Sequence, residues 1–211
     1  MKIKNLDELN TKVTEETSWR KFEIISLLSL CTSNIGDIKK IYLRASHTMI
    51  YAHFEGCIKA LSEYYLNFIS YQRIPFIEMS IPIAAAALKS KINEFIDTKK
   101  SSKYIDIYKI ILENTDKHNI SSNYCIDSNA NLNSKMFTEI CFCIGMDETL
   151  YLSKLPNIDE KLCKIRHEIA HGKKLEIIEN DFKEVSDMVL EIIDTYSTQI
   201  ILLATQKKYK K

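Results

Sequence analysis

The scarcity of helix breakers is the feature that most restricts how this chain can fold. Its 211 residues include 4 glycines and 3 prolines, whereas average usage would supply roughly 15 and 10. Tight turns and hairpins depend on these two residues, and helix interiors exclude them. The hydrophobic content of 45% is enough for a packed core and excludes a disordered chain. We therefore expect one all-α domain over residues 1–211, a bundle of long antiparallel helices with short additional helices.

Apolar residues at steps of three and four locate the long helices. A helix over residues 38–71 is expected to bury one continuous stripe, formed by Ile50, Phe54, Ile58, Leu61, Tyr65 and Phe68. The last helix, at about 181–206, has an apolar face that fits a bundle neighbour or a second protomer; it consists of Phe182, Val185, Val189, Ile192, Tyr196 and Leu203. Another amphipathic helix is expected before Asn34, on Trp19, Phe22, Ile25, Leu28 and Cys31.

Shorter segments lie between these helices. Their expected helical ranges are about 80–97, 104–112, 136–144 and 156–171. The last of these is opened by Pro156 and stopped by Gly172, and its buried stripe is expected to be Ile158, Leu162, Ile165 and Ile169. Residues 114–134 are dense in Asn, Ser and Asp and predict an irregular loop, and residues 207–211 form a basic tail.

Charge and cysteine content restrict the possible partners and the compartment. Lys and Arg number 29 and Asp and Glu number 28, so a nucleic-acid partner would need a local basic patch. The six cysteines have no zinc-finger spacing and are expected to be reduced core residues. Residues 1–10 are polar where a signal peptide would be apolar, and no run of 18 apolar residues is present. We expect a cytoplasmic protein without a membrane segment.

The segment Arg166 to Gly172, with the sequence RHEIAHG, contains the residues best suited to catalysis. It fits His-Glu-x-x-His, in which His167 and His171 would bind zinc and Glu168 would be the general base. It also contains Arg-x-x-x-x-His, a pair able to cleave a phosphodiester without metal. The two interpretations imply different substrates and different chemistry.

Three observations weaken the zinc interpretation. A catalytic zinc needs a third protein ligand, and the nearest downstream acid on a predicted helix, Glu184, lies only 13 residues after His171. No strand is predicted that could hold an extended peptide substrate. Gly172 ends the helix directly after His171, which leaves little support for a ligand pair. A zinc metallopeptidase stays as an alternative.

The Arg-His pair has the chemistry that RNA cleavage requires. Arg166 supplies a permanent charge and a planar fork of donors for a phosphate. His171 titrates near neutrality and can take a proton from a ribose 2′-hydroxyl or return one to the leaving oxygen. On one helix the two side chains diverge by roughly 140°, so a common target needs a second protomer or a long arginine reach. Without a function, Arg166 would be a surface residue and His171 a helix cap.

Several segments together resemble the HEPN superfamily, whose members are helical and often metal-independent ribonucleases. Arg166 to Gly172 is similar to its R-[polar]-x-x-x-H signature. Ser18 to Lys21, Tyr51 to Gly56 and Ser128 to Asn133 resemble, in order, segments of the branch known as RiboL-PSP or MAE-like. The resemblance implies a metal-independent endoribonuclease without cofactor, the toxin of a toxin–antitoxin system or part of antiphage defence.

The resemblance also implies roles for individual residues. Arg166 and His171 would be catalytic, His167 would orient the site, and two chains would dimerise so that their 166–171 helices line one cleft. Lys173 occupies the position of the tyrosine found in the branch partnered with a nucleotidyltransferase antitoxin, so adenylylation is not expected there.

Residues around the motif are expected to support it. Arg44, Tyr51 and Glu55 lie near one face of the 38–71 helix by their spacing and would have supporting roles at the cleft. Lys173 and Lys174 would border the cleft and bind RNA. We therefore expect RNA as substrate, a homodimer, and a cognate antitoxin or defence protein as a further partner. A non-catalytic helical interaction module is a second alternative to the ribonuclease.

Overall fold

The structure is a computed structural model that describes residues 2–98, 100–113 and 131–211. Over these residues it contains helices and no strand, which confirms the all-α prediction. The elements in order are α1 (Leu6–Ser33), α2 (Gly36–Tyr71), η1 (Phe76–Glu78), α3 (Ile81–Thr98), α4 (Ser102–Glu113), α5 (Ser134–Ile144), η3 (Thr149–Tyr151), α6 (Leu155–Asn157), η4 (Ile158–Cys163), α7 (Lys164–Ala170) and α8 (Glu179–Thr205). Most of the predicted 114–134 loop lies outside the described residues.

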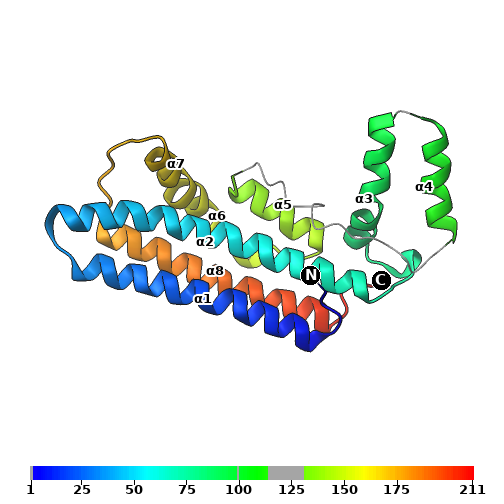
Figure 1. Ribbon diagram of the computed structural model, residues 1–211, viewed down its shortest axis with the longest axis horizontal. Helices are drawn as coiled ribbons and strands as arrows, with labels where there is room; N and C mark the ends of the chain where they lie inside the picture. Colours follow the sequence, from blue (N-terminus) through cyan, green and yellow to red (C-terminus); the bar gives the residue numbers. More distant parts are fainter. Residues whose placement is uncertain (1, 99, 114–130) are drawn as a thin grey trace.

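Helices α1, α2 and α8 form the body of the molecule, with α2 and α8 running opposite to α1 (Figure 1). The six apolar residues predicted for the buried stripe of α2 are all buried, as are five of the six predicted for α8, while Leu203 is partly buried. Both predicted faces are therefore confirmed, and α8 uses its face against α1 and α2 of the same chain. The short helices α5 and α7 lie along α2, and α3 and α4 form a separate hairpin at one end (Figure 1).

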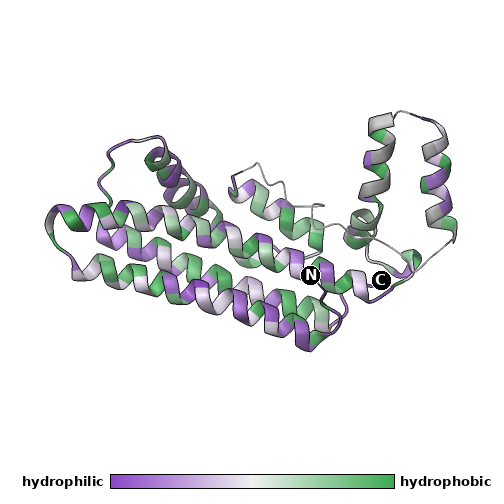
Figure 2. Cartoon of the chain, in the orientation of Figure 1, coloured by the Kyte–Doolittle hydropathy of each residue, from purple (hydrophilic) through white to green (hydrophobic). Residues whose placement is uncertain are grey.

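The predicted apolar face of α1 is wrong for three of its five residues. Trp19, Phe22 and Ile25 are 44%, 72% and 57% exposed, while Cys31 is buried and Leu28 packs against the core. Residues three positions apart are separated by about 300° around a helix, so each step falls about 60° short of a full turn. Five residues spaced by threes therefore spread around the helix and cannot share one face. Figure 2 shows the resulting apolar positions on the outer side of this helix. Leu9, Val13 and Ile24 face the core instead.

Helix α8 is the one helix of the described part that is long and apolar enough to cross a membrane by length and composition alone. After Asp187 it has only two charged residues, Glu191 and Asp194, before its end. This differs from the expectation that no segment would be apolar enough. Its apolar face is nevertheless covered by α1 and α2, as in the core helix of a bundle.

The predicted basic tail is docked by its backbone on η1 and the start of α3. Tyr209 is buried, and its carbonyl oxygen accepts a hydrogen bond from the Ser80 amide at 2.9 Å. The Lys211 amide donates to the Glu78 carbonyl at 2.9 Å. The four lysine side chains of residues 207–211 stay exposed, so only the tyrosine of this segment joins the core.

Phe137 on α5 joins the short helices to the body. Its ring is fully buried and lies 6.0 Å from Phe54, 4.9 Å from Tyr151 and 6.0 Å from Tyr196, measured between ring centroids. Such a site has close neighbours on all sides, and it cannot collapse fully when the ring is removed.

We expect Phe137→Ala to lower the free energy of unfolding by about 3–5 kcal/mol because it leaves a cavity among three aromatic rings. The matched control is Phe142→Ala on the same helix, where the ring is 69% exposed and the expected change is within about 0.5 kcal/mol. Urea unfolding of both variants measures the difference. Equal losses in the two variants would contradict this packing.

Candidate active site

A π-helical turn precedes the motif. One continuous helix was expected from Pro156 to His171, but the structure has α6, then the π-turn η4, then α7. At about 100° per residue, Arg166 would lie about 80° around the axis from the buried Ile158 in an uninterrupted α-helix. The π-turn takes up one extra residue, so Arg166 lies within about 20° of Ile158 instead. The turn therefore directs Arg166 inward, toward α2.

Arg166 rests on Tyr51 of α2. Its Cζ atom lies 3.9 Å from the centroid of the Tyr51 ring, a cation–π arrangement. Its Nη2 donates a hydrogen bond to Oδ1 of Asn131, and its Nε is buried without a hydrogen-bond partner. The guanidinium is therefore held in place by one aromatic face and one amide oxygen.

Tyr51 is a neutral platform for this arginine. The ring is buried, and its hydroxyl oxygen accepts a hydrogen bond from the Leu132 amide at 2.8 Å. Burial, with the Glu55 carboxylate as a smaller cause, raises the pKa of Tyr51 to about 12, although Arg166 and the Leu132 amide oppose the shift. The phenol therefore stays protonated at neutral pH. The expectation that Tyr51 lies beside the motif agrees with its position here.

The segment that supplies Asn131 is fixed between α2 and the π-turn. The Leu132 carbonyl accepts from Cys163 Sγ at 3.2 Å, and the Ser134 amide donates to Asp159 at 2.8 Å. Sequence reasoning did not single out Asn131, although it falls in a stretch that resembles the HEPN branch. Nothing in the local pattern indicates an arginine 35 residues away as its partner.

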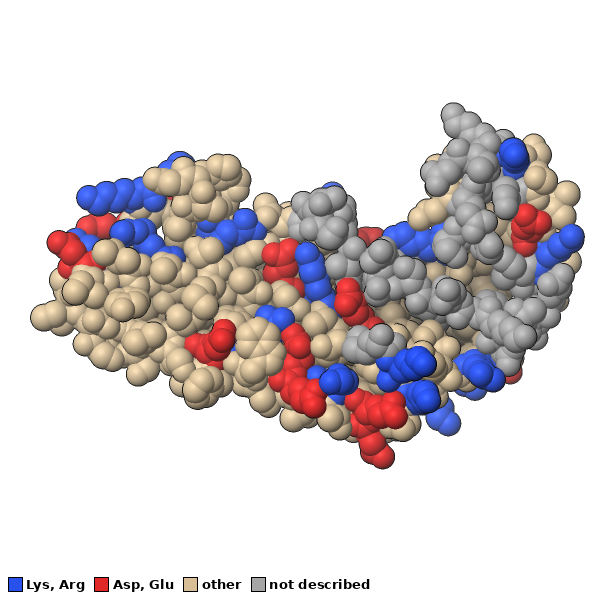
Figure 3. Space-filling model, in the orientation of Figure 1, with Lys and Arg blue, Asp and Glu red and all other residues tan. Residues whose placement is uncertain are grey.

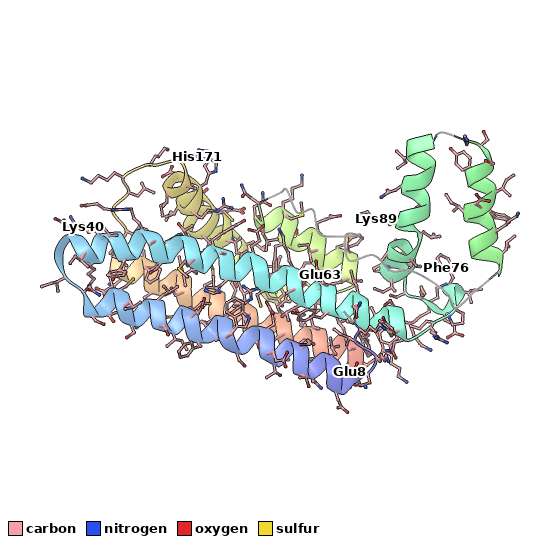
Figure 4. The ribbon with its side chains drawn as sticks, viewed as in Figure 1. Glu8, Lys40, Glu63, Phe76, Lys89 and His171 are labelled. Carbon is pink, nitrogen blue, oxygen red and sulfur yellow. The ribbon has the colours of Figure 1, made fainter. Side chains whose placement is uncertain are left out.

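His171 lies at the exposed end of α7 (Figure 4). It is the C-cap residue, and Gly172, with a φ of +79°, ends the helix there. The His171 ring packs beside that of His167, with 4.3 Å between centroids. Arg166, by contrast, contacts Tyr51 of α2 and Asn131.

The zinc alternative gains no support from this arrangement. The two histidine rings are adjacent, but the Glu168 carboxylate pairs with Lys173 Nζ at 3.2 Å. In the described part of the chain, no cluster of three or more His, Cys, Asp or Glu residues could hold a metal ion. A catalytic zinc takes three protein ligands, and these two histidines are therefore not a catalytic zinc site by themselves.

Basic side chains surround the loop that follows the motif. Arg44 Nη1 donates to the Leu175 carbonyl at 3.5 Å, and Lys40 pairs with Glu176 at 2.9 Å. Lys173 and Lys174 are exposed in this loop. Figure 3 shows Lys and Arg atoms gathered over α7 and the adjoining end of α2. Glu55 lies one helical turn beyond Tyr51 and binds Lys59 Nζ at 2.7 Å.

His47 is a buried residue at this site that sequence reasoning missed. It lies on α2, one turn before Tyr51, and its Nε2 is 2.9 Å from the Lys161 carbonyl in the π-turn. Loss of hydration lowers its pKa to about 4, although the carbonyl opposes the shift. No spacing in the sequence relates a histidine on one helix to a backbone oxygen 114 residues later.

Comparison with known proteins identifies the family. A family model described as RiboL-PSP-HEPN matches residues 15–202. Searches of curated proteins and of solved structures gave no significant match. The matched range includes all of α2, most of α1 and α8, the π-turn and the motif of α7. The chain therefore belongs to the RiboL-PSP branch of the HEPN superfamily.

Proposed function

We propose that this protein is a metal-independent endoribonuclease. The observation that carries the proposal is the placement of Arg166, fixed on Tyr51 and Asn131, on the short helix that ends at the exposed His171. Membership of the HEPN superfamily supports a nuclease-type module in general. RNA as substrate fits this pair, because ribose carries its own nucleophile.

The reaction uses the 2′-hydroxyl of the substrate. His171 takes its proton as the O2′–P bond forms, and Arg166 stabilises the negative charge that grows on the phosphate oxygens. The P–O5′ bond then breaks, and a proton from an imidazolium reaches the leaving 5′-oxygen. The products are a 2′,3′-cyclic phosphate and a 5′-hydroxyl. Two copies of His171 in a dimer would supply the base and the acid separately.

RNA would approach over the basic side chains near the motif. Lys174 and Lys173 are exposed beside His171, and Arg44 lies at the base of their loop. Since the net charge of the chain is +1, this local patch rather than a global field would attract phosphate. RNA affinity should therefore fall as salt concentration rises.

A homodimer through the outer face of α1 and α2 would complete the site. This face, called here the α1–α2 face, consists of Trp19, Phe22, Leu30, Ile38, Ile41, Tyr42 and Met49. These side chains are between 38% and 72% exposed and together present on the order of several hundred Å² of apolar surface. A standard interface takes roughly 800 Å² from each partner. Few charged atoms interrupt this part of the surface (Figure 3), so a second identical face can approach without like-charge repulsion.

The position of α7 agrees with a shared cleft. Helix α7 lies along the same half of α2 that carries the α1–α2 face, and α1 lies on the other side of α2 (Figure 1). The two chains would be related by a two-fold axis that lies in the plane of the α1–α2 face and points from α1 toward α7. Rotation about this axis leaves the α7 helices of both chains on the same side of the dimer. We propose this geometry, together with a cytoplasmic location and a role in a toxin–antitoxin or antiphage system whose partner protein restrains cleavage.

We expect Arg166→Ala and His171→Ala each to lower the rate of RNA cleavage by about 10²-fold or more, because each removes charge stabilisation or proton transfer. Lys12→Ala, at a distant ion pair of α1, is the control and should leave the rate unchanged. A gel assay on one labelled RNA measures all three. Unchanged cleavage by Arg166→Ala would overturn the assignment, and an inactive wild-type chain would favour the interaction-module alternative.

Cleavage should continue in the presence of a chelator, because 2′-hydroxyl attack needs no metal-bound water. Mass spectrometry should find 2′,3′-cyclic phosphate ends. Glu168→Ala should cost little, although it would remove the general base of a zinc peptidase. Stoichiometric zinc in the purified protein, with activity lost to chelator and restored by zinc, would establish the metallopeptidase alternative instead.

Light scattering after size-exclusion chromatography should report a dimer. Met49→Glu should produce monomers because it places a charge in the α1–α2 face, whereas Ile105→Glu, at a 58% exposed position of α4, should not. Mixed Arg166→Ala and His171→Ala chains should regain some cleavage if the cleft is shared. A fully active monomer would refute the dimer proposal.

A further inference from the structure

We infer that His47 is a positioning residue for Arg166: its imidazole donates a hydrogen bond to the Lys161 carbonyl, fixes the π-turn, and so holds the guanidinium against Tyr51. The kinetic part of this inference rests on the proposed function. The geometric part does not, since it concerns only the placement of one side chain by another.

The burial and bonding of His47 show what its side chain contributes. It is 1% exposed, and its Nε2 lies 2.9 Å from the carbonyl oxygen. A carbonyl can only accept, so Nε2 carries the hydrogen and the neutral ring leaves Nδ1 as an acceptor. Nδ1 is buried and has no hydrogen-bond partner. Burial of an unpaired Nδ1 costs free energy because the atom loses its hydrogen bonds to water, and an apolar side chain of similar size would avoid this cost. The hydrogen bond from Nε2 to the π-turn is the interaction that offsets it.

The π-turn is tied to α2 by one side-chain donor. The Lys164 amide bonds the Asp159 carbonyl in the i→i+5 pattern, and α7 continues with ordinary helical geometry. His47 donates to the Lys161 carbonyl, inside the turn. The imidazole therefore anchors the π-turn to α2 in the register that places Arg166 against Tyr51.

The register of this turn decides where Arg166 points. Loss of the extra residue would rotate the whole of α7 by about 100°. Arg166 would then leave the Tyr51 ring, and its bond to Asn131 would be lost. The same α2 face thus holds both ends of the arrangement: His47 fixes the turn, and Tyr51, four residues later, receives the arginine.

Two substitutions at His47 separate the hydrogen bond from the volume of the side chain. His47→Met fills the space with a flexible apolar chain and removes the donor, whereas His47→Gln keeps a donor on Nε2. We expect His47→Met to lower kcat for RNA cleavage by about 10-fold or more, as a displaced catalytic group does, and His47→Gln to recover part of that loss. No recovery by His47→Gln relative to His47→Met would count against the hydrogen bond.

The same substitution in an Arg166→Ala background tests whether His47 acts through the arginine. If it does, His47→Met should cause no further loss of the residual activity, because the group that it positions is already gone. Equal fold-losses in both backgrounds would overturn the inference. The matched control is Ile69→Met, a buried residue at the end of α2 far from the motif. It should alter stability without lowering kcat.

Crystal structures of the two variants give a readout that needs no activity. In His47→Gln, Arg166 Cζ should stay near 3.9 Å from the Tyr51 centroid, and in His47→Met the π-turn should be lost and the arginine displaced. An intact π-turn with Arg166 in place in His47→Met would refute the inference whether or not the protein cleaves RNA. If His47→Met does not fold, His47→Gln decides alone: a displaced Arg166 with the amide donor present would refute it.

Discussion

The contact between α2 and the segment 158–170 is the constraint on which the site depends. Helix α2 is held by α1 and α8 through a continuous apolar stripe that includes Ile50 and Phe54. The same buried side of the helix also presents His47 and Tyr51 to the motif segment. A rigid helix held in this way can position catalytic groups to the tolerance that chemistry requires, which loops alone rarely provide. The bundle core thus fixes the helix that carries Tyr51, the ring on which Arg166 rests.

The position of Arg166 bears on the proposal that two chains form the site together. An arginine that packs on an aromatic ring keeps its charge while it loses freedom of movement. His171 stays exposed at the helix end, about 120° around the axis from the buried side once the π-turn is included. In the proposed reaction, a phosphate that contacts Arg166 would meet its proton-transfer group from another direction. The α1–α2 face, which is apolar and poor in charge, offers a way for a second chain to provide it.

Much of the fold could be predicted from the sequence, because it depends on local spacing. The stripe from Ile50 to Phe68 follows steps of three and four and is buried as expected, and Gly172 ends α7 as expected. Trp19 and Phe22 were misplaced because a spacing of three drifts around a helix. Tyr209 became a core residue because the chain end returns to Ser80, which no local pattern indicates.

The sequence singled out residues of the candidate site, whereas the contacts that arrange them could not be predicted from it. Arg166 and His171 were singled out by chemistry and by resemblance, and their divergence followed from helix geometry. The π-turn depends on a hydrogen bond from His47, and the arginine depends on Asn131, both of which are remote in sequence. Tertiary contacts of this kind leave no periodic signal in a single sequence, so the inward turn of Arg166 could be found only in the structure.

A crystal structure of the protein with an RNA whose 2′-hydroxyl at the cleavage site is replaced by hydrogen tests the central claim most directly. The account predicts a phosphate oxygen within hydrogen-bond distance of the Arg166 guanidinium, which remains on Tyr51, and a His171 imidazole from one of two facing chains beside the modified ribose carbon. RNA bound elsewhere, with Arg166 unoccupied by phosphate and no His171 near any ribose, would contradict it.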